Sequence, residues 1–304
     1  MQSVVVENII KAYGKKKEFT ALSDISFEVP RGELFGLIGP DGAGKTSLFR
    51  ILTTLLLADS GKATVDGFDV VKDYKVIRKR VGYMPGKFSL YPDLSVEENL
   101  NFFATIFNTS IEENYDLVKD IYVQIEPFKK RKAGKLSGGM KQKLALSCAL
   151  IHRPSVLFLD EPTTGVDAVS RKEFWEMLKG LKKQGITILV STPYMDEAAL
   201  CDKVALIQNG RILSIDTPIR VVNNFSNPLW AAKSPQMLHL LNDLLRLDVV
   251  QDAYPFGEFH HVVMKNESGI EKLKQFIDGR QNENAVLQEV KPDIEDCFIA
   301  LMKN

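Results

Sequence analysis

The residues whose types and spacing most clearly indicate a chemical role form one glycine-rich segment. This segment stands between an apolar run and a helical pattern, and it matches the sequence GxxxxGK[ST]. Glycines let backbone amides curl around an anion, and the N-terminus of a helix adds partial positive charge. In such a loop, Lys45 reaches the β- and γ-phosphates of a nucleotide, and the Thr46 hydroxyl is a ligand for Mg²⁺. We therefore predict a phosphate-binding site rather than an ordinary glycine-rich turn. Its residues are Gly39, Pro40, Asp41, Gly42, Ala43, Gly44, Lys45, Thr46 and Ser47.

Two acidic residues, Asp160 and Glu161, come directly after the apolar run 156–159. If that run is a buried strand, both acids lie at the carboxyl edge of the sheet, beside the phosphates. Asp160 is then placed to ligate Mg²⁺, and Glu161 is placed to act as the general base that polarises an attacking water. Such an acidic pair is common after apolar strands, so this prediction depends on the phosphate loop that precedes it.

A third segment, Leu136-Ser137-Gly138-Gly139-Met140, opens a helical pattern shortly before the apolar run that precedes Asp160. A serine and two glycines at a helix start offer backbone amides and one hydroxyl to an anion. The segment resembles the signature motif of ATP-binding-cassette (ABC) proteins, normally LSGGQ, with Met140 in place of the glutamine. This resemblance implies that Ser137, Gly138 and Gly139 contact an ATP molecule held by a second cassette, so that two cassettes work as a head-to-tail dimer.

Two further positions extend the resemblance, which covers residues 1 to about 219 with the motifs in family order. Tyr13 lies where the family has an aromatic residue that stacks on adenine; an exposed surface tyrosine is the alternative. Asp167 lies in a loop whose aspartate contacts the opposite subunit of the dimer. The sequence is most similar to bacterial ATP-binding subunits that pair with export permeases of the multidrug and antibiotic type. The C-terminal part, including Pro292–Ile299, is similar to the extension found in that group.

The resemblance implies a P-loop NTPase fold with an antiparallel β arm, and ATP and Mg²⁺ as cofactors. It implies an integral membrane permease and a second ATP-binding cassette, identical or different, as partners. Hydrolysis of ATP would then drive export from the inner face of the cell membrane. A soluble ABC ATPase of translation or DNA repair is an alternative, although those proteins usually carry paired cassettes or long coiled-coil inserts.

Two positions depart from the family pattern. After residues 81–85 the family has a glutamine that touches Mg²⁺ and the attacking water, and this chain has Gly86. After Ser191-Thr192 the family has a histidine that bonds the γ-phosphate, and this chain has Pro193. Glycine offers no side-chain ligand, and proline lacks even a backbone N–H. We expect intact nucleotide binding with impaired hydrolysis, which leaves open a nucleotide-binding regulatory module with negligible turnover.

The hydrophobic pattern predicts the elements that position these residues. Alternation of strands and helices predicts an α/β domain with a largely parallel sheet over residues 1–219, interrupted by a helical insert at about 87–153. In the insert, Ser95 and Glu98 form a capping box. Residues 220–304 are expected to form a small α+β domain. The expected strands are 4–6, 25–29, 33–38, 156–159, 187–190, 204–207, 229–232 and 261–264, and the expected helices include 47–57, 235–246 and 270–277.

Composition narrows the class of protein further. Lys+Arg and Asp+Glu are equal at 39 each, so no electrostatic footprint for nucleic acid is present. The three cysteines are scattered, which fits free thiols in a reducing cytosol. The first residues do not form a signal peptide, and the apolar runs are far shorter than the ~20 residues that span a bilayer. We expect a cytoplasmic subunit that is peripheral to the membrane through its permease.

Overall fold

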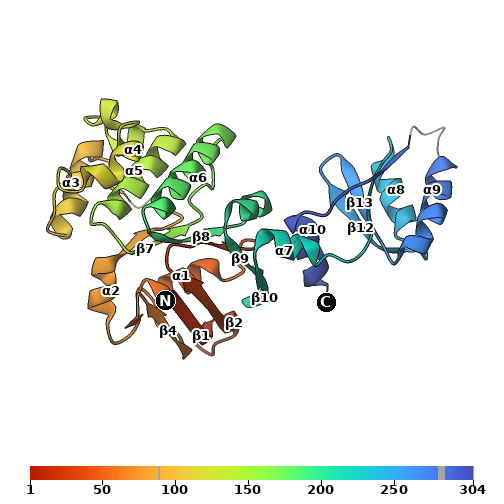
Figure 1. Ribbon diagram of the computed structural model, residues 1–304, viewed down its shortest axis with the longest axis horizontal. Coiled ribbons are helices and arrows are strands. Elements are labelled where there is room, and N and C mark those ends of the chain that lie inside the picture. Colours follow the sequence, from red (N-terminus) through yellow and green to blue (C-terminus); the bar gives the residue numbers. More distant parts are fainter. Residues whose placement is uncertain (88–89, 280–284, 304) are drawn as a thin grey trace. The chain divides into compact units, whose positions relative to one another are not determined.

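The chain is described by a computed structural model that covers residues 1–87, 90–279 and 285–303. Contacts between residues divide it into two compact units, Met1–Pro218 and Ile219–Lys303. Each unit has sheets of its own (Figure 1).

The first unit is built around a six-stranded sheet with the order β10-β9-β3-β8-β7-β6. Neighbouring strands are parallel except for β9 and β10, which are antiparallel. Every residue of β3, β7 and β8 is buried, as expected for parallel strands that are covered on both faces. The strands are β3 (Leu34–Ile38), β6 (Val81–Met84), β7 (Val156–Asp160), β8 (Thr187–Thr192), β9 (Lys203–Gln208) and β10 (Arg211–Asp216).

A second, antiparallel sheet forms an arm with the order β2-β1-β4-β5. Its strands are β1 (Gln2–Tyr13), β2 (Phe19–Pro30), β4 (Ser60–Val65) and β5 (Phe68–Asp69). The arm shares one apolar core with the six-stranded sheet and with helix α1 (Lys45–Leu52). In that core, Phe27 of the arm stacks on Phe35 of β3 with ring centroids 5.3 Å apart, and Phe49 of α1 meets the ring of Phe158 at 5.6 Å. Helix α1 is therefore fixed between the arm and the sheet.

Helix α1 ends at Leu52, so the prediction of a helix to residue 57 was wrong at its C-terminal end. Thr54 has a φ of 64°, its N–H donates to Ile51 O at 3.0 Å, and the N–H of Leu55 donates to Arg50 O at 2.7 Å. These bonds form a Schellman motif, in which the left-handed residue is usually glycine. Because a threonine takes that place, the sequence carries no visible stop signal.

Between β6 and β7 the chain is mainly helical, with α3 (Val96–Ile106), α4 (Tyr115–Tyr122) and α5 (Gly138–Leu150). These helices gather on one side of the first unit in Figure 1, with α5 in contact with both others. The capping box is confirmed, because Ser95 Oγ accepts from the N–H of Glu98 at 3.2 Å and Glu98 Oε2 accepts from the N–H of Ser95 at 2.7 Å. Helices α2 (Tyr74–Arg80) and α6 (Ala168–Lys183) lie outside this insert, and α6 contacts β3 and β8.

The second unit contains an antiparallel sheet with the order β12-β13-β11-β14. Helices α8 and α9 pack on one face of this sheet, and α10 contacts the other face through Asp296. The Asp296 carboxylate accepts from the hydroxyl of Tyr254 at 2.8 Å and lies 2.6 Å from His261 Nδ1. Figure 1 shows the helices on opposite sides of β12 and β13. The elements are α7 (Pro218–Asn223), which spans the division, β11 (Leu229–Lys233), α8 (Met237–Leu244), β12 (Val250–Phe256), β13 (Phe259–Met264), α9 (Ile270–Asp278), β14 (Val286–Glu289) and α10 (Ile294–Met302).

The three cysteines, Cys148, Cys201 and Cys297, are free, as predicted, and all three are buried. Burial raises the pKa of the Cys148 thiol. Over residues 1–87, 90–279 and 285–303, none of the helices combines the length and the apolar content that a membrane span needs.

Candidate functional site

The glycine-rich segment lies between β3 and α1 and is held by backbone bonds to residues that come much later in the sequence. The N–H of Gly39 donates to Thr192 O at 3.2 Å, and the carbonyl of Ala43 accepts from the N–H of Gly210 at 3.1 Å. A Cβ at Gly39 would come within 2.1 Å of the carbonyl oxygen of Ile207. Gly44 has a φ of 105°, so this position also requires glycine. The loop is therefore fixed by close backbone contacts that only glycine permits.

Lys45 is the first residue of α1, and its side chain is only 2% exposed. Its Nζ donates to the carbonyls of Gly39 at 2.8 Å and Pro40 at 3.0 Å, so the lysine lies beneath its own loop. The same Nζ lies 3.1 Å from Glu161 Oε1, whose side chain is 24% exposed. The predicted phosphate-binding lysine and the predicted general base are thus in direct contact, although they are far apart in sequence.

The two predicted acids lie at the carboxyl end of β7. Asp160 is 2% exposed, and its Oδ1 accepts from the Ser191 hydroxyl at 2.6 Å. Glu161 has a φ of 50°, a left-handed conformation that is uncommon for a residue with a side chain. Its N–H donates to the carbonyl and the hydroxyl oxygens of Ser191 at 3.0 and 3.1 Å, which holds this turn against β8. Burial, together with the nearby Asp160 carboxylate, raises the pKa of Tyr83 to about 12, so its phenol stays protonated beside the acid.

Tyr13 ends β1 next to the phosphate loop, with its hydroxyl 3.0 Å from Ser47 Oγ. Its side chain remains partly exposed, and the Lys11 Nζ lies 5.7 Å from the ring centroid. The tyrosine is therefore beside the loop, and its stacking on adenine remains a prediction. Asp41 and Gly42 are exposed at the tip of the loop, and Thr46 is half-buried in the first turn of α1.

The signature residues and Asp167 lie at the starts of two neighbouring helices. Ser137 is exposed and caps α5, where its Oγ accepts from the N–H of Met140 at 3.3 Å. A Cβ on Gly139 would lie 2.7 Å from Ser170 Oγ, so the two helix starts are in close contact there. The Asp167 carboxylate caps α6, and the backbone N–H of Ser170 lowers the pKa of that carboxyl. Contacts of these residues with a second subunit remain a prediction.

Of the two departures from the family pattern, Gly86 lies beside the acids, and Pro193 follows a residue that holds the loop. A Cβ at Gly86 would be 3.0 Å from Asp160 O and 3.7 Å from Glu161 Cβ. Pro193 directly follows Thr192, whose carbonyl accepts from Gly39.

Two further residues lie at the site without a motif in the sequence to mark them: Ser191, which contacts both acids, and Glu197, a buried carboxylate close to Pro193. Serine is common at strand ends, and an acid in the first turn of a helix ordinarily faces solvent, so neither residue gave a signal.

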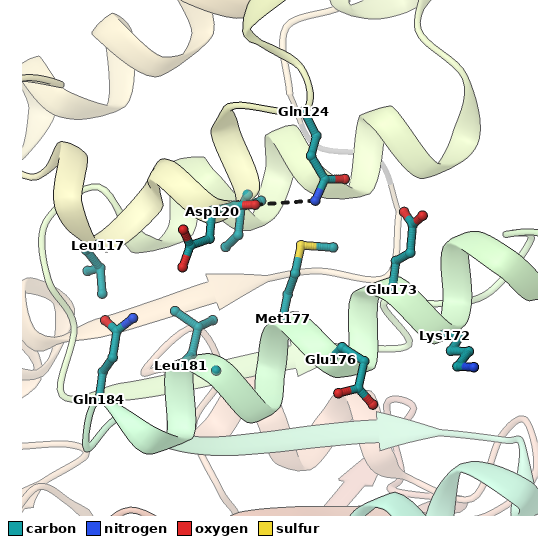
Figure 2. Close-up of a pocket in the computed structure, with 11 residues that line it drawn as sticks. Leu117, Asp120, Gln124, Lys172, Glu173, Glu176, Met177, Leu181 and Gln184 are labelled. Carbon is teal, nitrogen blue, oxygen red and sulfur yellow. Dashed lines mark hydrogen bonds between the residues drawn. The ribbon is translucent and has the colours of Figure 1, made fainter.

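A groove of about 480 Å³ lies between α4 and α6 and does not include any of the predicted site residues. Figure 2 shows Leu117 and Leu181 near one end of it and Met177 near its centre, with Glu173 and Glu176 on α6. The side-chain amide of Gln124 donates to the carbonyl of Asp120 at 3.3 Å. This groove is distinct from the phosphate loop and the acids.

The curated proteins to which the chain is similar are ATP-binding proteins. The chain is 39% identical over 303 residues to the probable multidrug ABC transporter ATP-binding protein YbhF of Escherichia coli, an alignment that covers 97% of the chain and 52% of that protein. It is 37% identical over 214 residues to the linearmycin resistance ATP-binding protein LnrL of Bacillus subtilis, covering 69% of the chain and 68% of that protein. The chain thus spans about half the length of the Escherichia coli relative.

A solved structure and a family model agree with these relatives. The structure of cbiO1 from Clostridium perfringens, part of the ABC transporter complex cbiONQ, matches with a TM-score of 0.65 and 26% identity, over 81% of this chain and 96% of that chain. The sequence model of the ABC transporter family matches residues 22–164, which include the phosphate loop, the signature and both acids. The expected P-loop cassette fold is confirmed, and the chain belongs to the ABC transporter family.

Proposed function

We propose that this chain is the ATP-binding subunit of an ABC exporter, which binds MgATP and drives a separate integral membrane permease. The observation that carries the proposal is the contact between Lys45, held beneath the phosphate loop, and Glu161 at the end of β7. This arrangement suits a triphosphate whose γ-phosphate replaces Glu161 as the partner of Lys45. The names of the relatives from Escherichia coli and Bacillus subtilis support export of drugs or antibiotics.

The residues at the site fit a magnesium ion that is bound together with the nucleotide. Among the described residues, no group of three or more His, Cys, Asp or Glu side chains could hold a metal ion by itself. Mg²⁺ is commonly bound by one or two protein oxygens and by substrate phosphates, so the Thr46 hydroxyl and the Asp160 carboxylate are sufficient candidates. When bound, the ion would neutralise charge on the phosphate oxygens.

In the proposed reaction, Glu161 polarises a water that attacks the γ-phosphorus, and the bond to the leaving oxygen of ADP breaks. Lys45 stabilises the negative charge on the transferred phosphoryl group. Ser191 orients the Asp160 carboxylate through the bond to Oδ1. Tyr13 stacks on the adenine next to Ser47.

We further propose that this subunit forms an uneven half of a dimer of two cassettes. Losing one transition-state contact typically costs about 2.7–4 kcal/mol, or roughly 10²–10³ in rate. Gly86 and Pro193 remove two such contacts from this chain's own site. Ser137, Gly138, Gly139 and Asp167 remain available to complete the partner's site. A heterodimer in which the partner's phosphate loop performs most of the hydrolysis follows from this asymmetry.

A regulatory module with negligible turnover is the second candidate, because Gly86 and Pro193 also favour it. The intact Asp160 and Glu161 oppose it. We also propose that residues 1–219 perform nucleotide binding and that residues 220–304 serve assembly or regulation. Through the permease, the subunit would lie on the cytoplasmic face of the membrane.

Calorimetric titration of the purified chain with MgATP tests the nucleotide site, and ATPase assays of the chain alone and with its permease separate the two candidates. Turnover that appears only in the assembled complex supports the exporter subunit. Binding without turnover in either preparation supports the regulatory module. Absence of nucleotide binding by the folded chain would refute both.

A further inference from the structure

A buried carboxylate, Glu197, joins two segments of the candidate site. It lies in a short 3-10 helix, Met195–Leu200, directly after β8, and it is only 1% exposed. Its Oε1 accepts from the hydroxyl of Thr163 at 2.8 Å, and its Oε2 accepts from the hydroxyl of Thr192 at 2.6 Å. Both threonines are themselves buried, at 1% and 0% exposure.

The same carboxylate has a cationic partner on α6. Arg171 Nε lies 3.3 Å from Glu197 Oε1. The guanidinium also pairs with the exposed Asp196 at 2.9 Å and lies over the ring of Tyr194, 4.4 Å from its centroid. A buried carboxylate is costly unless its charge is compensated, and here two hydroxyls and one guanidinium compensate it.

The partners of Glu197 are next to the groups that carry the proposed reaction. Thr163 comes two residues after Glu161, in the turn that contains the left-handed φ of 50°. Thr192 accepts at its carbonyl from the N–H of Gly39, the first residue of the phosphate loop. The carboxylate therefore couples the Glu161 turn to the strand that supports the loop.

Glu161 is fixed from two sides by these bonds. On one side its N–H donates to Ser191, and on the other Thr163 is held by Glu197. If the second support is lost, the Glu161 carboxylate can move while the backbone contacts of Gly39 and the cradle of Lys45 remain. Since a misplacement of about 1 Å can reduce a rate by roughly 10²-fold, the expected damage is to turnover rather than to binding.

We propose that Glu197 is a positioning residue for ATP hydrolysis, which holds the Glu161 turn against the end of β8. This inference rests on the proposed function of the site and adds to it a residue that does not contact the nucleotide. It also assigns Thr163 and Thr192 as the two hydroxyl groups through which Glu197 acts.

The test uses the full chain and measures two quantities for each variant: the Kd for MgATP, and the rate constant of hydrolysis in a single turnover with enzyme in excess. We expect Thr163→Val to lower the rate constant by roughly tenfold or more with Kd changed by no more than about twofold. Thr163→Ser keeps the hydroxyl and should restore the rate. Glu197→Leu should give the largest loss of rate, and Glu197→Gln, which keeps one acceptor oxygen, an intermediate one.

Asp196→Asn is the matched control, because it removes the exposed partner of Arg171 and leaves the buried carboxylate in place. We expect its Kd and rate to equal those of the wild-type chain. If Glu197→Leu does not fold, the pair Thr163→Val and Thr163→Ser still decides the question, since each changes only one buried side chain.

Unchanged rates in Thr163→Val and Glu197→Gln would overturn the positioning role. A loss of affinity for MgATP in equal proportion to the loss of rate would also overturn it. A wild-type chain that binds MgATP and never completes a single turnover would also overturn it, while the nucleotide site would stand. A folded wild-type chain that does not bind MgATP would instead refute the proposed function itself.

Discussion

The amino group of Lys45 lies 3.1 Å from the carboxylate of Glu161, while both carbonyl bonds of the lysine go to its own loop. The two residues with the most important proposed roles thus neutralise each other. A triphosphate that enters the loop must compete with Glu161 for the lysine, and the displaced carboxylate becomes available to orient water. Nucleotide binding and release of the Glu161 carboxylate from Lys45 are therefore coupled through this one ion pair.

Replacing Lys45 with alanine should weaken binding of MgATP severely. The substitution removes the cation that lies beneath the loop and leaves the backbone bonds of Gly39 and Ala43 in place. Calorimetry measures the affinity, and circular dichroism checks the fold. An unchanged Kd would contradict the assignment of the loop as the phosphate site.

Glu161→Gln should have the opposite effect on binding. Without the carboxylate, Lys45 no longer has a competing anion, so we expect the affinity for ATP to be equal to or higher than that of the wild type. Hydrolysis should fall by about 10²-fold or more, because a general base typically contributes 10²–10⁴. A lone wild-type chain that hydrolyses ATP at ordinary transporter rates, blocked by this substitution, would overturn the impaired-site proposal.

Restoring the family residues with Gly86→Gln and Pro193→His should speed turnover if the chain dimerises. The structure adds a condition, since a Cβ at position 86 lies only 3.0 Å from Asp160 O and the neighbouring turn must shift slightly. Gly86→Ala is the matched control for this crowding, and we expect it to cost about 1 kcal/mol of stability without any gain in rate. Equal rates in the double variant and in the wild type would argue that other groups limit hydrolysis.

A chain ending at Asn223, the last residue of α7, should fold and bind MgATP with an unchanged Kd. The contacts of the phosphate loop and of both acids all lie within the first unit, Met1–Pro218. The measurements are calorimetry and the cooperativity of thermal unfolding. A truncated chain that is folded but has lost its affinity would contradict the proposed division of labour.

The pH dependence of stability should carry a contribution from His152. Its Nε2 lies 3.1 Å from Val81 O, its ring stacks on Phe107 at 3.7 Å, and burial lowers its pKa to about 4. Since the unfolded chain binds this proton near pH 6.5, the folded state loses stability as pH falls from about 6.5 to 4, by up to about 2–3 kcal/mol. Below pH 4 both states are protonated and the loss levels off.

The matched variant for this effect is His152→Gln, which keeps an N–H for the Val81 carbonyl. Denaturant unfolding of both proteins at several pH values gives the difference. We expect the wild type to lose stability relative to the variant only between about pH 6.5 and 4. Parallel curves over that range would show that the histidine is not held neutral.

Part of the fold could be predicted because several strands, such as β3, β7 and β8, are short apolar runs and some helices, such as α3 and α5, begin with a side-chain cap. The run that became β7 is buried along its whole length, and Ser95 with Glu98 formed the expected capping box. The end of α1 could not be predicted, since Thr54 occupies a left-handed position without the usual glycine. The hydrophobic pattern of a sequence does not show where a helix ends when the end depends on hydrogen bonds back to the preceding turn.

The candidate site likewise contains residues that could be predicted from the sequence and residues that could not. The loop and the acids are contiguous motifs, so their chemistry is visible in the sequence. The supports are not contiguous: Ser191 and Glu197 reach Asp160, Glu161 and Thr163 from another strand and its following turn. Only the parallel pairing of β7 with β8 brings these side chains together.

The order of the strands has a consequence for how the protein is made. Strand β3 leaves the ribosome before its two neighbours in the sheet, because β8 and β9 are translated about 150 residues later. The loop lacks its backbone bonds until Thr192 is available to accept from Gly39 and Gly210 is available to donate to Ala43. The nascent chain therefore carries a nucleotide motif without a nucleotide site until translation has passed Gly210. Up to that point the apolar strand β3 lacks both neighbours, and this is the stage of synthesis at which we expect chaperones to be needed most.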